Sequence, residues 1–88
     1  MFAILARESG STQPRLGLSI AARIIGNAVA RNRIKRVVRE SFRLHQYELP
    51  NVDIVVNARS AAKSATNNEL RRSLEQHWHS VKKKCARS

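Results

Sequence analysis

The sequence has little of what marks secreted, metal-binding or membrane proteins. It contains one cysteine, Cys85, so no internal disulfide can form and the thiol alone supplies no metal site. No apolar run approaches the roughly 18 residues that span a bilayer. The N-terminus lacks the basic start and long apolar core of a signal peptide. We therefore expect a cytoplasmic chain with no membrane contact.

Acidic residues are scarce as well. The 88 residues include 6 Asp and Glu against 17 Lys and Arg, which gives a formal net charge of +11. An excess of this size favours a polyanionic partner, nucleic acid first and an anionic membrane surface second. Without that partner, the positive charges repel one another and destabilise the compact state.

Groups that could carry catalysis are also missing. The carboxylates are scattered, without the paired spacing of a general acid and base, and no Gly-rich phosphate loop is present. His77 and His79 lie two residues apart on an expected helix, so they point about 200° away from each other and cannot share a metal. We expect no catalytic residue, no metal site and no cofactor bound by the protein alone, and nothing indicates an obligate protein partner.

What is present is a periodic pattern that predicts one small domain. Leu16, Leu18 and Ile20 alternate as in a half-buried strand, whereas Leu70, Leu74 and Trp78 recur at helical spacing. The expected elements are strands at 1–7 and 15–24, a helix at 28–47, a strand at 52–58 and a helix at 68–84. We expect the first two strands to pair as an antiparallel hairpin. The order predicts a small α+β sandwich over residues 1–84, followed by a basic tail at 85–88.

The helix expected at 28–47 is basic on one side. Ile34 and Val38 lie on its apolar face, and Asn27 is a plausible N-cap. A series at four-residue spacing lies largely on the other side, where like charges repel by a few tenths of a kcal/mol per pair. The series is Arg31, Lys35, Arg39 and Arg43, with Asn32 and Arg36 nearby. Folding does not favour such a row, but a nucleic-acid backbone does, because each neutralised phosphate releases counterions.

The alternatives to a nucleic-acid surface are a merely solvated basic face and a membrane-binding face. For the kind of nucleic acid, a helix-turn-helix protein would need a helix before the basic one, where this chain has expected strands. Aromatic residues that would mark a base-stacking sheet are sparse, with only Phe2 in a strand. The pattern favours recognition of shape and backbone over reading of bases.

The stretch GNAVARNRIKRVVRESFR at 26–43 strongly resembles the protein subunit of bacterial ribonuclease P. That family carries an Arg-Asn-Arg signature, here Arg31, Asn32 and Arg33, in a basic helix that follows a strand resembling RLGLSIAARI. The resemblance extends from Phe2 to about Lys84. It implies an RNA-binding role that includes Arg33, in which the protein assists a catalytic RNA that removes the 5′ leader of precursor tRNA. Hydrolysis, with magnesium, is implied to belong to that RNA.

The resemblance also implies details of the fold. The family connects parallel strands through the basic helix by a left-handed crossover, against the general preference. Its members usually begin with a further helix and a short strand, and a cleft between that helix and the sheet holds the leader. This chain starts at what resembles the second strand, so we expect one under-covered sheet face, with Phe2 and Ile4 as cleft residues. Arg23 and Arg59 are further candidate RNA contacts or, equally, solvated strand-end charges.

Two other functions are compatible with a basic domain of this size. One is a general RNA-binding or ribosome-associated module without processing activity, and the other is a basic DNA-binding protein. Neither class of protein is expected to contain the 26–43 stretch together with its flanking strands, so this combination favours the ribonuclease P subunit.

Overall fold

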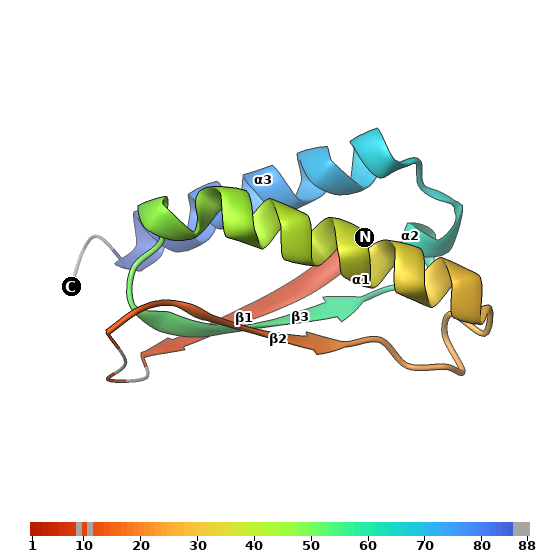
Figure 1. Ribbon diagram of the computed structural model, residues 1–88, viewed down its shortest axis with the longest axis horizontal. Helices are drawn as coiled ribbons and strands as arrows, with labels where there is room; N and C mark the ends of the chain where they lie inside the picture. The colour runs from red at the N-terminus through yellow and green to blue at the C-terminus, as the bar shows by residue number, and fades with distance from the viewer. Residues whose placement is uncertain (9, 11, 86–88) are drawn as a thin grey trace.

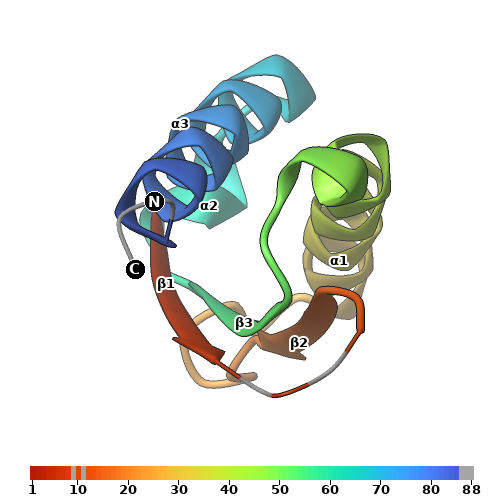
Figure 2. The same cartoon turned by 90° about the vertical axis from the view of Figure 1, so that its left-hand side faces the viewer.

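The computed structural model describes residues 1–8, 10 and 12–85. The elements in chain order are β1 (Phe2–Glu8), β2 (Arg15–Ser19), α1 (Ala28–His45), the 3-10 turn η1 (Gln46–Glu48), β3 (Val52–Ala58), α2 (Ala61–Ser64) and α3 (Asn67–Cys85). The strands form one sheet, and the helices lie together on one of its faces (Figures 1 and 2). The α+β architecture is confirmed. The short helix α2 was not predicted, and residues 86–88 of the expected tail lie outside the described residues.

The order of strands in the sheet is β1-β3-β2. β1 pairs antiparallel with β3, with Phe2 opposite Ala58, and β2 pairs parallel with β3, with Arg15 beside Asp53. The predicted hairpin between β1 and β2 is therefore wrong, because β3 lies between them.

Two physical reasons place β3 in the middle. Every second side chain of β3 is buried against the helices, which holds for neither β1 nor β2, so this strand gains most from a neighbour on each side. The six residues at 9–14 also exceed the two to five of an ordinary hairpin loop. A connection of six residues is long enough to span two strand spacings of about 4.8 Å each.

The connection from β2 through α1 to β3 joins parallel neighbours. In Figure 2 these two strands run away from the viewer, with β2 on the right and β3 to its left, and α1 returns above them. Passing from β2 upward through α1 and down to β3 turns counter-clockwise, so the crossover is left-handed. This is the hand that the family resemblance implied, opposite to the usual one.

The core lies between the sheet and the helices. Ile34 and Val38 of α1, Leu74 of α3 and Ile54 of β3 are each fully buried. Trp78 joins them, with 2% of its surface exposed, so it is a core residue and not a free stacking surface. Its indole N–H donates to the Ser41 hydroxyl oxygen at 2.8 Å. Ser41 is the one buried polar residue among the described residues, and this hydrogen bond satisfies its side chain.

Capping side chains set where the two long helices begin. The Asn27 carboxamide oxygen accepts from the backbone N–H of Val29 at 2.8 Å and, more weakly, from Ala30 at 3.4 Å, which confirms the predicted N-cap of α1. At the start of α3, Thr66 and Glu69 form a reciprocal capping box. The two hydrogen bonds with Thr66 lower the pKa of the Glu69 carboxyl.

Candidate nucleic-acid interface

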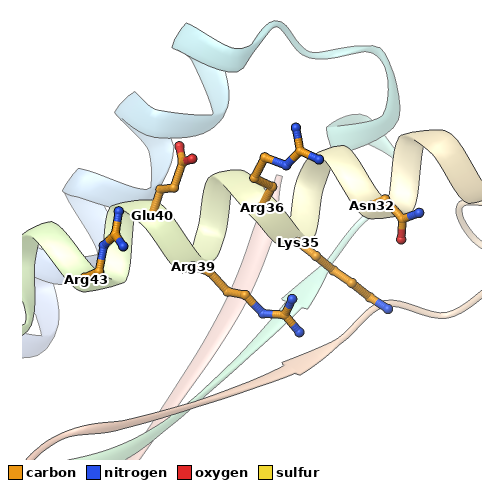
Figure 3. Close-up of a pocket in the computed structure, with 6 residues that line it drawn as sticks. All are labelled: Asn32, Lys35, Arg36, Arg39, Glu40 and Arg43. Carbon is orange, nitrogen blue, oxygen red and sulfur yellow. The ribbon is translucent and has the colours of Figure 1, made fainter.

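The outward face of α1 is exposed because the opposite face is packed into the core. A shallow depression of about 480 Å³ follows this outward face. Figure 3 shows its lining side chains, which are Asn32, Lys35, Arg36, Arg39, Glu40 and Arg43. Lys35 and Arg39 extend away from α3, whereas Arg36 and Glu40 extend toward it (Figure 3). The predicted polar face is thus one continuous surface of the molecule.

This surface is strongly positive. It carries four cationic groups and one carboxylate, that of Glu40. The Glu40 carboxylate lies 3.9 Å from Nη2 of Arg71 on α3, and both side chains are about half exposed, so the pair is weak. Arginines in such a depression can bind phosphate oxygens through forked hydrogen bonds. Its shallow shape suits an extended polyanion better than a small molecule.

The two arginines of the Arg-Asn-Arg signature, Arg31 and Arg33, bind groups within the protein itself. Nη1 of Arg31 donates to the Ile25 carbonyl oxygen at 2.9 Å, across the turn that leads into α1. Arg33 binds the connection between α2 and α3: Nη1 donates to the Ala65 carbonyl at 3.1 Å and to Oδ1 of Asn67 at 2.8 Å. Its Nη2 donates to the Lys63 carbonyl at 3.2 Å. Arg33 therefore fastens α3 to α1, and neither arginine lines the depression.

The remaining basic candidates also lie apart from the depression. Arg23 is exposed in the turns before α1, and Arg59 is exposed directly after β3, with its backbone N–H bonded to the Met1 carbonyl. The sequence interpretation missed Arg71, which lies beside Arg36 and Glu40 in the groove between α1 and α3. The only available signal was its exposed position on the second helix, since its contact with α1 depends on the tertiary fold.

The sheet face opposite the helices forms a second distinct surface. Its middle row contains Leu5, Val55 and Gly17, with Leu5 67% and Val55 39% exposed. In the next row, Arg15 makes a forked pair with the Asp53 carboxylate, at 2.8 Å from Nε and 3.1 Å from Nη2. This hydrogen-bonded contact raises the pKa of Arg15. The face is therefore an apolar strip bordered by charge.

The expected cleft residues of β1 need a correction. Phe2 and Ile4 pair with Ala58 and Val56, whose side chains face the helices, and Phe2 keeps only 5% exposure. They are part of the core or packed against it. Alternation fixes that Phe2 and Ile4 share a face, but only the register with β3 decides which face that is. The residues of β1 on the uncovered side are Ala3, Leu5 and Arg7.

Within 1–8, 10 and 12–85, no three His, Cys, Asp or Glu side chains are grouped so that they could hold a metal ion. No helix of that part of the chain has the length and apolar character needed to cross a membrane.

The fold and the charged surface define a small, basic α+β protein whose most basic helix, α1, lies in a left-handed crossover. A family model described as Ribonuclease P matches residues 1–82. The chain belongs to the family of ribonuclease P protein components. These proteins are RNA-binding subunits of the ribonucleoprotein enzyme that matures the 5′ ends of tRNA, and the catalytic activity resides in the RNA.

Individual relatives agree with this assignment. The chain is 47% identical over 85 residues to the ribonuclease P protein component of Pseudoalteromonas atlantica and 48% identical over 85 residues to that of Methylococcus capsulatus. Each match covers 97% of this chain, which spans 71% and 66% of those two proteins. A solved structure of the Staphylococcus aureus RNase P protein superposes with a TM-score of 0.80 at 37% identity, over 91% of this chain and 72% of that one.

Proposed function

We propose that the outward row of α1, defined as Lys35, Arg39 and Arg43, binds the backbone of the ribonuclease P RNA. The observation that carries this proposal is the exposed basic depression along α1. None of the three side chains is buried there, and the nearby Glu40 carboxylate pairs with Arg71 instead of with any of them. Each phosphate that such a row neutralises releases counterions and strengthens binding. Arg36 and Asn32, which line the same depression, add further donors.

We propose that the uncovered sheet face holds the 5′ leader of precursor tRNA. Leu5 and Val55 offer an exposed apolar strip on which unstacked bases can lie, and Gly17 leaves the strip flat on the β2 side. Arg7 borders the strip in the next row, beside the Arg15–Asp53 pair, and its guanidinium would hold a phosphate of the single strand. The leader would then lie on a different surface from the outward row, so one small domain would contact two RNAs.

In the proposed enzyme the RNA binds the magnesium that hydrolysis requires, and the protein contributes cationic side chains that reduce repulsion between the RNA partners. We expect the complex to act in the cytoplasm, where newly made tRNA is matured.

Reconstitution tests the proposal. The purified chain is added to a ribonuclease P RNA transcript at low magnesium, and leader removal from precursor tRNA is followed. We expect the wild-type chain to stimulate cleavage and the combined variant Lys35→Ala, Arg39→Ala, Arg43→Ala to stimulate it much less. The matched control, Arg72→Ala with Lys82→Ala and Lys83→Ala, removes the same charge from exposed positions of α3. Equal loss in both variants would show that total charge, and not the row, matters.

A second experiment tests the sheet face. Replacing Leu5 by Ser removes much of the exposed apolar strip without touching the core. In the reconstituted complex, we expect it to reduce the preference for precursor tRNA over mature tRNA and to leave assembly with the catalytic RNA unchanged. The same preference in the Leu5→Ser variant and the wild type would exclude this face as the leader site.

A further inference from the structure

The four-residue series on α1 does not stop at Arg43. The next step reaches Tyr47, in the turn η1 that directly follows the helix. His45 (φ −109°, ψ −3°) and Gln46 (φ −60°, ψ −31°) lie between them with right-handed backbone angles, and the chain tightens there from the α-helix into the 3-10 turn. Tyr47 therefore lies just beyond the C-terminal end of the basic row, with Leu44 three residues before it.

Tyr47 is far more exposed than folding alone explains. It is 91% exposed, the largest value among the exposed large hydrophobic residues of the described chain, and Leu44 is 75% exposed. The sequence contains four aromatic residues, and the other three, Phe2, Phe42 and Trp78, are buried in the core. An apolar ring left in water beside a row of cations contributes nothing to the core. Its position fits a partner that presents both phosphates and flat rings.

We propose that Tyr47 stacks on an unpaired RNA base, with Leu44 against the edge of the same base. This inference rests on the proposed function of the outward row, which would lead the RNA backbone along α1 to this end. Aromatic side chains beside phosphate-binding cations are a general means of holding unpaired bases. A base inside a duplex has both faces covered by its neighbours, so the site selects a nucleotide at a helix end, a bulge or a loop.

Equilibrium binding of two RNA probes tests the site. One probe is a fully paired duplex and the other is the same duplex with a short single-stranded extension. We expect Tyr47→Ala to weaken binding of the extended probe by at least about fivefold, the lower end of the range for base stacking on aromatic residues. Duplex affinity and the salt dependence should stay unchanged, because no phosphate contact is lost. Tyr47→Phe keeps the ring and should bind as the wild type does.

Val29→Ala is the matched control, because Val29 is an apolar residue of α1 with 77% exposure near the opposite end of the helix. It should change neither affinity. Tyr47 is also the only tyrosine of the chain, so incorporation of 3-fluorotyrosine gives a single ¹⁹F resonance. That resonance should shift when the extended probe is added and move less with the duplex. This readout needs no enzymatic activity.

Failure of the stacking site can be told apart from failure of the outward row. If Lys35→Ala, Arg39→Ala, Arg43→Ala loses affinity for both probes while Tyr47→Ala binds both as the wild type does, the row is correct and the stacking site is wrong. If the triple variant binds both probes normally, the RNA surface proposed for α1 is wrong, and the stacking proposal built on it is overturned too. An equal loss for both probes in Tyr47→Ala would also overturn stacking on an unpaired base.

Discussion

Arginines at two places on α1 share their chemistry and differ in their surroundings. Arg39 and Arg43 lie in the exposed depression, whereas Arg31 and Arg33 donate hydrogen bonds to backbone carbonyls elsewhere in the protein. The difference follows from where the helix points each side chain and from which backbone groups would otherwise lack donors. A basic helix can therefore divide its guanidinium groups between binding a partner and holding its own fold. Charge alone does not tell the two apart.

Arg31 and Arg33 should contribute to stability, whereas Arg39 and Arg43 should not. The largest loss of stability is expected at Arg33. Arg33→Ala removes three hydrogen bonds, to Lys63, Ala65 and Asn67, and should lower the free energy of unfolding by about 1 to 3 kcal/mol. Arg33→Lys should rescue little, because an ammonium group cannot reproduce the planar fork that reaches three acceptors. Urea unfolding followed by Trp78 fluorescence measures the change. A stability equal to that of the wild type would show that the α2–α3 connection does not depend on Arg33.

A smaller loss is expected at Arg31, which makes one backbone contact. Removing its hydrogen bond to the Ile25 carbonyl should lower the free energy of unfolding by about 1 kcal/mol. The matched variant is Arg39→Ala, also on α1, which should leave stability unchanged or raise it slightly because repulsion along the row falls. Thermal denaturation of both variants gives the comparison. If Arg39→Ala proved to be the less stable of the two, the division between the two sets would be wrong.

The smallest effect is expected at Glu40, the single carboxylate of the depression. Glu40→Gln removes the weak pair with Arg71, which contributes less than about 1 kcal/mol to stability. It also removes the one negative charge beside Arg36 and Arg39, so RNA should bind several-fold more tightly at low salt, with the gain shrinking as salt is added. Filter binding at two salt concentrations measures it. Weaker RNA binding by this variant would mean that the depression does not face phosphates.

Local patterns in the sequence predicted most of the elements. Helical spacing of Ile34 with Val38 and of Leu70 with Leu74 located both long helices to within two residues of their observed ends, because periodic burial is a property of neighbours along the chain. The α+β class followed from the order of these elements. The basic residues on the outward face of α1 were identified for the same reason.

Features that depend on contacts distant in sequence were not predicted. The central place of β3 required knowing which strand buries most surface, and the face of β1 that meets the helices required its register with β3. Arg33 is separated by about 30 residues from the carbonyls it binds, so no spacing pattern along the chain could predict these hydrogen bonds. The left-handed crossover followed from family resemblance, and the general rule of handedness predicts the opposite.

The most direct measurement is the salt dependence of binding to ribonuclease P RNA, compared between the outward row and Arg33. With Lys35, Arg39 and Arg43 replaced by Ala, the slope of log affinity against log salt should fall in magnitude by about 2 to 3, since each lost phosphate contact removes about 0.7 to 0.9. Under conditions where Arg33→Ala remains folded, that variant should keep the wild-type slope. An unchanged slope in the row variant, or an equal fall in Arg33→Ala, would contradict the division of α1 into an RNA-binding row and arginines that hold the fold.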